Sequence, residues 1–287
     1  MTENSDLQNI KVAVVMRAYN EEQFIEKSLI SLLNQNFLPY RIIVVNDGST
    51  DRTSEILKSF KEIEIINRKR KEKVEFFTPE EPKIINDGLE RLANETDCKY
   101  IMNLDADHIL PKDYISKMIH NMEKEPDLVV CSGVIEGEYF VIPVHSGRVY
   151  RYDYLKKFNL KYPEKFAAED YLILKAQSMG YKIKIFSDIV TKVLRKTKTR
   201  WSDPHSFYDV GRGMKALGYA FPYVLIKSML IGVKNPKNGI FLLRGFFAKN
   251  TQLYEPEFRK FVRKTQYRNL LHLNSEFYKR GTNLIRN

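Results

Sequence analysis

The chain has 287 residues, of which 43% are hydrophobic and 29% are charged. This composition excludes a disordered chain, and the length accommodates one large domain or one domain with an appendage. Two cysteines, Cys98 and Cys131, are too few for a disulfide framework and lack metal-finger spacing, so the sequence favours a reducing, cytoplasmic protein.

The net charge of +11 is concentrated in the last third of the chain. Residues 195–287 contain 19 Lys+Arg against 5 Asp+Glu, whereas the remainder contains 28 against 31. A basic tail predicts an acidic partner, which is a phosphorylated substrate, an anionic lipid or nucleic acid. No recognised nucleic-acid-binding module is present, so nucleic acid is the least expected of these partners.

We expect neither a secretory signal nor a membrane-spanning helix. Residues 1–8 are polar and acidic, so we expect no secretory signal. A spanning helix needs about 18 apolar residues without charge, and no such stretch exists.

Apolar strands alternate with amphipathic helices in the first part of the chain. We expect strands over 11–16, 41–45 and 63–66, with intervening helices capped by Asn20 and Asp51. This βαβαβ order predicts a parallel sheet with right-handed crossovers.

The next segments continue the same pattern. The basic run 68–71 is interpreted as a solvated surface rather than a phosphate site. We then predict a buried strand at 100–104, a mixed or antiparallel strand at 137–144, and further regular elements at 82–94, 112–124, 128–133, 169–180 and 181–186.

The pattern changes after Arg195. Three glycines, Gly211, Gly213 and Gly218, are expected to interrupt the segment that contains them. The runs 221–233 and 240–247 are apolar with isolated positive charges, and 255–287 has the composition of a polar helix. We therefore predict a domain at 1–194 and a basic, mainly helical extension at 195–287 that contacts an acceptor, a membrane surface or an oligomer partner.

Asp105-Ala106-Asp107 follows the predicted buried strand directly. Ligands of open α/β sheets bind beyond the carboxyl ends of the strands, and two neighbouring carboxylates repel each other unless a cation lies between them. A hard ion such as Mg²⁺ or Mn²⁺, which also holds substrate phosphates, is the natural candidate. The alternative is that both aspartates only cap the following helix. His108 is expected to cap the start of a helix as well.

Further carboxylates follow other predicted strands or begin a helix, namely Glu21, Asp47 and the Glu169-Asp170 pair. The sequence lacks both the Gly-x-Gly-x-x-Gly and the P-loop patterns, which disfavours a dinucleotide cofactor and P-loop ATP binding. The remaining candidate ligand is a nucleoside diphosphate that is held through its base, its ribose and a metal ion.

These motifs together resemble the family 2 glycosyltransferases, over roughly residues 11–200. The residues that carry the likeness are Arg17-Ala18-Tyr19-Asn20-Glu21-Glu22, Val44-Val45-Asn46-Asp47-Gly48-Ser49-Thr50-Asp51, Leu104-Asp105-Ala106-Asp107, and Glu169-Asp170 followed by Leu172 and Gly180. The resemblance implies an α/β protein of the GT-A type, with a Rossmann-like, mixed but mainly parallel sheet flanked by helices.

The resemblance also implies roles for particular residues. The nucleotide of a sugar donor would be bound by Ala18, Tyr19, Glu21 and Asp47, the ribose or donor sugar by Asp105, and the metal by Asp107 with help from Asp105. The general base would be Asp170, with Glu169 second. Without the resemblance, the last two would be interpreted as acidic residues that favour a helix N-terminus.

Some positions depart from the family pattern. Asn46 stands where Asp is common, and Ile85 stands where a basic residue is common, so Lys83 is the expected substitute. Arg195 lies roughly where many relatives have a metal- or diphosphate-binding His, and His205 is the next candidate, with a surface-loop histidine as its alternative.

Other arginines add to the predicted phosphate site. We expect Arg195 and Arg200 to bind phosphate oxygens, with Arg212 as a further candidate, unless these side chains are simply solvated.

The leading hypothesis is therefore an inverting, metal-dependent transferase that uses a nucleotide-sugar donor and a glycan or lipid-linked acceptor. One alternative is a sugar nucleotidyltransferase, although the glycine-rich N-terminal loop that it requires is missing. Another is a non-catalytic carbohydrate-binding or membrane-adaptor protein with the same fold.

Overall fold

The computed structural model describes residues 9–70, 77–95, 97–138, 142–195 and 204–271. The strands in these ranges are β1 (Lys11–Ala18), β2 (Arg41–Asn46), β3 (Glu64–Asn67), β4 (Cys98–Asp105), β5 (His108–Ile109), β6 (Leu128–Ile135), β7 (Arg148–Arg151) and β8 (Lys182–Val193). The helices are α1 (Ile25–Leu33), α2 (Thr53–Lys58), α3 (Glu81–Glu90), α4 (Tyr114–Lys124), α5 (Tyr152–Lys156), α6 (Ala168–Ser178), α7 (Pro204–Leu217), α8 (Phe221–Lys234), α9 (Pro236–Phe246) and α10 (Pro256–Leu271).

The chain forms two compact units. The first takes in the described parts of Met1–Lys73, Lys83–Tyr162 and Gly180–Lys196, and the second those of Val74–Pro82, Pro163–Met179 and Thr197–Asn287. The second unit therefore includes α6 and the start of α3 as well as the C-terminal helices. The predicted domain boundary between residues 194 and 195 stays a prediction.

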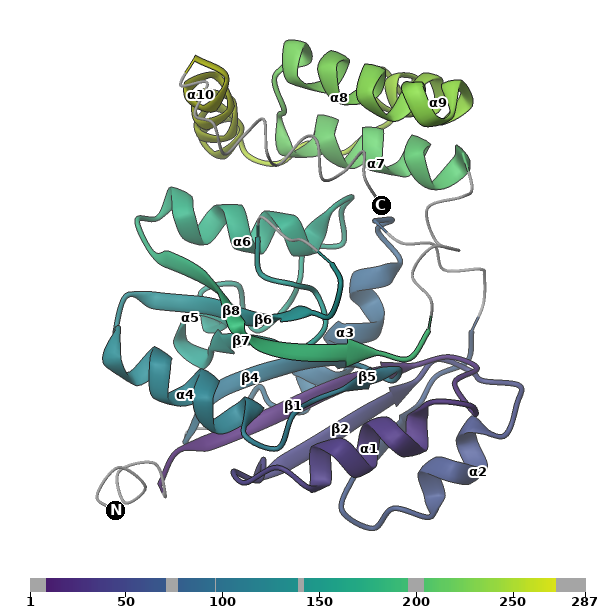
Figure 1. Cartoon of the computed structure of the whole chain (residues 1–287), viewed down its shortest axis with the longest axis vertical. Coiled ribbons are helices and arrows are strands. Elements are labelled where there is room, and N and C mark those ends of the chain that lie inside the picture. Colours follow the sequence, from purple (N-terminus) through teal and green to yellow (C-terminus); the bar gives the residue numbers. More distant parts are fainter. Residues whose placement is uncertain (1–8, 71–76, 96, 139–141, 196–203, 272–287) are drawn as a thin grey trace. The chain divides into compact units, whose positions relative to one another are not determined.

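The first unit contains a mixed sheet with the strand order β3-β2-β1-β4-β7-β6-β8-β5 (Figure 1). Strands β3, β2, β1 and β4 are mutually parallel, as the βαβαβ pattern predicted. β7 runs antiparallel to both β4 and β6, and β8 returns parallel to β6. The expectation of a mixed, mainly parallel α/β sheet is confirmed.

Strand β1 lies at the centre of the core. Val12, Val14 and Met16 have no exposed surface and belong to one apolar cluster with side chains of α1 and α4. Val15, on the opposite face, approaches Gly88 of α3 so closely that a Cβ there would lie 2.3 Å from its Cγ1. Both faces of the strand are covered, which explains why its sequence is continuously apolar instead of alternating.

Two sequence-based predictions about the first unit are wrong. No strand occurs in the described part of 137–144, and the antiparallel strand is β7 instead. His108 does not cap a helix, because it is a fully buried residue of β5. The apolar neighbours of His108 in the sequence gave no sign that such a short strand would pair with β8.

Asn20 also differs from its predicted role as the cap of α1. The helix begins five residues later, and its N-cap, Phe24, makes no side-chain cap. Asn20 has a left-handed φ of 53°, which asparagine tolerates, and its side-chain oxygen accepts a hydrogen bond from the Thr50 N–H at 2.8 Å. It thus connects the loops that follow β1 and β2.

The second unit includes the helices α7 to α10, and close backbone contacts join α7 to α9. Gly211 of α7 faces the Leu242 carbonyl, and a Cβ there would lie 2.1 Å from that oxygen. Gly245 of α9 faces the Tyr208 carbonyl in the same way, at 1.9 Å. The prediction that Gly211 and Gly213 interrupt this segment is wrong, since both lie inside α7. The absence of a side chain at Gly211 allows α9 to cross α7 closely at that point.

Candidate active site

The ends of β1, β2 and β4 bring three of the four predicted motifs together in the first unit. The register pairs Arg17 with Asp105 and Ala18 with Asn46, so the three strands finish at the same level. The N–H of Asp47 donates to the Ala18 carbonyl at 2.9 Å. The loops that carry Tyr19, Glu21, Asp47 and Asp107 therefore share one edge of the sheet.

Asp47 is almost completely buried and is held by two arginines. Its Oδ1 lies 2.9 Å from Nη1 of Arg68, and its Oδ2 lies 2.6 Å from Nη1 of Arg70. Burial raises the pKa of Asp47, although the two guanidinium groups oppose this effect. The guanidinium carbon of Arg70 also lies 3.6 Å from the centroid of the Tyr19 ring.

These contacts overturn the interpretation of 68–71 as a solvated basic run, at least for Arg68 and Arg70. Only the adjacent Lys69 is exposed among the described residues of that run. Each guanidinium is directed to a buried carboxylate, which the local sequence does not reveal because Asp47 is more than 20 residues away. The signal that was available is the alternation of arginine and lysine directly after strand β3.

Asn46 has a structural explanation for its departure from the family pattern. Its amide nitrogen donates to Ser54 Oγ at 2.8 Å and to Asn67 Oδ1 at 3.0 Å, while its amide oxygen accepts from the Ser49 N–H at 3.2 Å. A carboxylate cannot donate the first two hydrogen bonds. Asn46 therefore fixes the loop beside Asp47.

Asp105 lies between two basic side chains that the sequence did not single out. Its Oδ1 is 2.9 Å from Arg17 Nε and 3.5 Å from His145 Nε2. Its backbone N–H donates to Ser146 Oγ at 2.8 Å. The loop before β7 thus contributes two side chains to the Asp-x-Asp motif, and only the three-dimensional structure reveals this contribution.

Ser146 also contacts the buried imidazole of His108, whose Nδ1 lies 2.5 Å from Ser146 Oγ. Burial lowers the pKa of His108 to about 4, so the ring is neutral at physiological pH. Ser28 Oγ donates to the His108 carbonyl at 2.8 Å. These bonds attach the motif to helix α1 and to the β7 loop.

Glu21, Asp107 and Arg195 form the second half of the site. Arg195 Nη2 contacts Glu21 Oε2, and Arg195 Nε lies 3.6 Å from Asp107 Oδ2. Burial raises the pKa of Glu21 to about 7; Arg195 counteracts this, and the negative charges of Asp107 and Asp105 add to it. Arg195 thus lies beside two of the carboxylates, and its predicted binding of phosphate oxygens stays a prediction.

The donor set of this edge fits a divalent cation. Glu21, Asp105 and Asp107 offer oxygen ligands, which Mg²⁺ and Mn²⁺ prefer. Burial is the main cause of the raised pKa of Glu21, and the charges of Asp107 and Asp105 add to it while Arg195 opposes it. A cation bound by Asp107 and Asp105 would reduce the repulsion among the three carboxylates.

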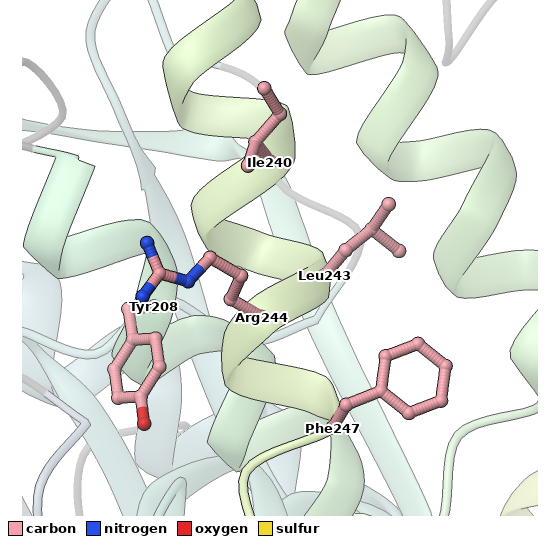
Figure 2. A pocket seen from close by; sticks show the side chains of 5 residues that line it. All are labelled: Tyr208, Ile240, Leu243, Arg244 and Phe247. Atoms are coloured by element: carbon pink, nitrogen blue, oxygen red, sulfur yellow. The ribbon is translucent and has the colours of Figure 1, made fainter.

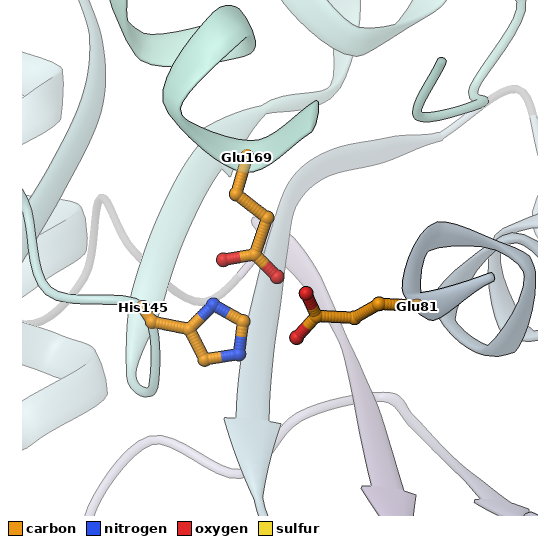
Figure 3. A group of neighbouring side chains, drawn as sticks. All are labelled: Glu81, His145 and Glu169. Atoms are coloured by element: carbon orange, nitrogen blue, oxygen red, sulfur yellow. The ribbon is translucent and has the colours of Figure 1, made fainter. Parts of the chain in front are cut away.

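Glu169 and Asp170 lie in the first turn of α6, in the second unit. Figure 3 shows Glu169 and Glu81 directed toward each other, and a carboxylate oxygen of each lies within 4.8 Å of one of the other. His145, which Figure 3 also draws, belongs to the first unit. The charge of Asp170 contributes to raising the pKa values of Tyr219 and Tyr254, after the larger effect of burial. Asp170 therefore lies close to these two phenols.

The remaining predicted residues are spread over both units. Lys83 is half-buried near the start of α3. His205 lies in the first turn of α7, with its ring 5.4 Å from the Phe241 ring centroid. Arg212 donates to the Asn250 carbonyl at 2.9 Å. Arg200 lies outside the described residues.

Comparison with known proteins identifies the family of this chain. The sequence pattern of the family described as glycosyl transferase family 2 matches residues 13–180, more than half of the chain. The protein therefore belongs to glycosyl transferase family 2. The matched segment includes all four predicted motifs.

Among curated relatives, an uncharacterized glycosyltransferase of Haemophilus influenzae is 35% identical over 129 residues, which are 44% of this chain and 36% of the relative. A poly-beta-1,6-N-acetyl-D-glucosamine synthase of Staphylococcus epidermidis is 30% identical over 129 residues, 42% of this chain and 28% of the relative. The similarity thus spans about a third of the length of these relatives.

Solved structures show the same fold. Staphylococcus aureus TarS in complex with UDP has a TM-score of 0.53 and 20% identity, covering 84% of this chain and 73% of that one. The mannosyltransferase PcManGT from Pyrobaculum calidifontis, in complex with GDP-Man and Mn²⁺, has a TM-score of 0.59 and 16% identity, covering 96% and 85%. The expected GT-A type of fold is confirmed.

Proposed function

We propose that the protein is an inverting glycosyltransferase that moves a hexosyl group from a UDP- or GDP-linked sugar to a glycan or lipid-linked acceptor. The observation that carries the proposal is the edge where β1, β2 and β4 end, with Asp47 held by Arg68 and Arg70 and with Asp105 and Asp107 beside Glu21. Family membership and the structural neighbours in complex with UDP, UDP-GlcNAc and GDP-Man support the choice of donor.

In this proposal, the nucleoside occupies the surface around Asp47, Tyr19 and Ala18. Arg70 and the Tyr19 ring present a flat stack beside the carboxylate, and such stacks bind aromatic bases. Asp105 binds the ribose or the donor sugar. Glu21 and Lys83 complete the predicted nucleotide contacts.

Asp107, with Asp105, would hold Mg²⁺ or Mn²⁺. When bound, the ion neutralises charge that develops on the leaving diphosphate. Arg195, which already lies beside Asp107, contributes a further positive charge for phosphate oxygens. His205 remains a candidate late ligand, and Arg200 remains a candidate phosphate-binding residue.

Asp170 is proposed as the general base, and Glu169 is the second candidate. The acceptor oxygen attacks the anomeric carbon, its proton passes to Asp170, and the bond from that carbon to the diphosphate oxygen breaks. A single displacement inverts the anomeric configuration. The charge of Asp170 near the buried phenols of Tyr219 and Tyr254 supports an environment that differs from free solvent.

We also propose a cytoplasmic location with peripheral contact to the inner face of the cell membrane, and an acceptor, membrane or oligomer role for the C-terminal extension. Both cysteines are buried free thiols, as suits a reducing compartment. The surface that would contact the membrane is described in the next subsection.

Calorimetric titration of UDP and GDP, with and without Mn²⁺, tests the nucleotide and metal parts of the proposal. We expect one of the two nucleotides to bind and Mn²⁺ to strengthen its binding. A nucleotidyltransferase would instead bind a nucleoside triphosphate and release pyrophosphate. A protein that binds neither nucleotide with metal would be a non-catalytic member of the fold.

Variants of the first turn of α6 test the proposed base. Asp170→Asn should abolish sugar transfer while nucleotide affinity stays within about threefold, because a base acts on the acceptor. Glu169→Gln is the matched control and should retain measurable transfer. A large loss of nucleotide affinity in Asp170→Asn would instead identify a binding residue, and transfer lost only in Glu169→Gln would exchange the two roles.

A further inference from the structure

Helix α8 has an exposed apolar face. Of its side chains, only Val224 and Ser228 are buried. Met229 is 61% exposed and Val233 77% exposed, and Ile226 and Leu230 are exposed beside them. The spacing of three and four residues places these side chains on one side of the helix. A contiguous stripe of this kind differs from the isolated apolar side chains that are normal on protein surfaces.

Helix α9 continues this surface. Ile240 and Phe247 are 56% and 62% exposed, and Arg244 lies between them on the same side at a spacing of four and three residues. The rings of Phe221, at the start of α8, and Phe247 have centroids 5.6 Å apart, so the start of α8 lies against the end of α9. We name as the α8–α9 face the exposed side chains Ile226, Met229, Leu230, Val233, Ile240 and Phe247.

The charged residues of α8 and α9 are all basic, namely Lys227, Lys234, Lys237 and Arg244. Lys227, Lys234 and Arg244 form no ion pair with any residue in the described ranges. An exposed apolar stripe on helices whose charged side chains are all basic complements the anionic headgroups and acyl boundary of a bilayer.

A hollow of about 480 Å³ shares Ile240 and Phe247 with the face. Tyr208 of α7 and Ile240, Leu243, Arg244 and Phe247 of α9 line it (Figure 2). Figure 2 shows Arg244 extending toward Tyr208 while the apolar side chains form the rest of the wall. A guanidinium at the edge of an apolar hollow suits a phosphate group that is joined to a hydrocarbon chain.

We propose that the α8–α9 face docks in the plane of an anionic phospholipid bilayer, with Arg244 on a lipid phosphate. Among helices in the described ranges, none is long and apolar enough to cross a membrane. α8 has 14 residues, about 21 Å of helix, which is shorter than a hydrocarbon core of about 30 Å. The inference specifies the membrane contact of the proposed function, but it is independent of sugar transfer because docking needs no donor.

Flotation of the full chain with vesicles tests the apolar contact. Vesicles of phosphatidylcholine alone and of phosphatidylcholine with phosphatidylglycerol are compared at low salt. We expect binding to the anionic vesicles, and a loss of at least about tenfold in Met229→Glu/Val233→Glu, since each added charge opposes burial in the interface. The control is Leu38→Glu/Val190→Glu, which changes two similarly exposed apolar residues of the first unit and should bind like wild type.

A second pair of variants tests the charges. Lys227→Gln/Lys234→Gln/Arg244→Gln should lower binding to anionic vesicles by at least about tenfold. Lys58→Gln/Lys61→Gln/Lys124→Gln removes the same charge from exposed positions and should change binding little. Circular dichroism verifies that all variants are folded.

Three outcomes would overturn the proposal. The first is wild-type vesicle binding by Met229→Glu/Val233→Glu. The second is an equal loss of binding in Lys227→Gln/Lys234→Gln/Arg244→Gln and in Lys58→Gln/Lys61→Gln/Lys124→Gln. The third is that the wild-type protein binds no vesicles but forms a dimer in light scattering, and that Met229→Glu dissociates this dimer. The face would then be covered by a second copy. Nucleotide binding is measured in parallel, so a failure of the proposed function is distinguished from a failure of docking.

Discussion

Arg70 lies flat against Tyr19, with its guanidinium carbon 3.6 Å from the ring centroid, while its Nη1 holds Asp47 at 2.6 Å. One side chain therefore orients both the carboxylate and the aromatic ring that the proposed nucleoside site requires. Tyr19 remains 38% exposed, and aromatic side chains of this kind are surfaces on which bases stack.

Arg70→Gln should weaken UDP or GDP binding by about tenfold, because it removes a stacking surface and leaves Asp47 held by Arg68 alone. Calorimetry measures the change. Lys69→Gln removes the same charge from the exposed neighbour and should leave affinity within about twofold of wild type. Equal losses in the two variants would show that net charge, rather than the stack, determines the affinity.

Glu21 should make the metal-free protein less stable as the pH rises. Its folded pKa of about 7 lies above the ordinary value of 4.5, so the folded state binds more protons than the unfolded state between these two pH values. Stability from this group is therefore lost as the pH rises from 4.5 through 7. In thermal unfolding across this window, wild type should lose stability relative to Glu21→Gln as the pH rises, and exposed Glu26→Gln should behave like wild type.

His108 should have the opposite effect. Its folded pKa of about 4 lies below the ordinary 6.5, so the unfolded state binds more protons between these values and stability is lost as the pH falls from 6.5 through 4. The effect is clearest in the Glu21→Gln background, where the opposing group is absent. Adding His108→Asn should remove this loss on acidification, whereas His120→Asn should retain it; the same slope in both would assign the effect to another group.

Two glycines give a matched pair of packing predictions. Gly88→Ala should lower the free energy of unfolding by about 1–3 kcal/mol, because its Cβ would lie 2.3 Å from Val15 Cγ1 in a close-packed core. Gly232→Ala, in α8, meets nothing within 4 Å and should be neutral or raise stability by up to about 1 kcal/mol through helix propensity. Denaturant unfolding measures both, and an unaffected Gly88→Ala would show that α3 shifts readily.

The parallel half of the sheet was predictable because its strands are continuously apolar and each ends in a polar motif. The same logic correctly placed Asp47, Asp105 and Asp107 on one edge. It missed Arg68, Arg70 and His145, since their contacts with those carboxylates depend on loop conformations rather than on local periodicity. It also missed Arg17, whose contact with Asp105 depends on the register between β1 and β4.

The second unit shows a different kind of limit. A glycine within an apolar segment indicates either a break or a close helix crossing, and the choice depends on the partner helix. Gly211 faces the Leu242 carbonyl, which lies some 30 residues away in the sequence and is placed there only by tertiary packing. Propensity alone therefore favoured the wrong alternative.

Arg195 provides the last prediction, because it competes for carboxylates that a metal would also use. It contacts Glu21 and lies 3.6 Å from Asp107 Oδ2, so a divalent ion at Asp107 is repelled by the guanidinium. Arg195→Gln should bind Mn²⁺ at least about fivefold more tightly in the absence of nucleotide, since a unit charge a few ångströms away contributes about 1–4 kcal/mol. Paramagnetic resonance of free Mn²⁺ measures this affinity, with exposed Arg52→Gln as the control. The same variant should bind UDP or GDP more weakly if Arg195 contacts the diphosphate. Unchanged Mn²⁺ affinity would show that the ion does not bind near Asp107.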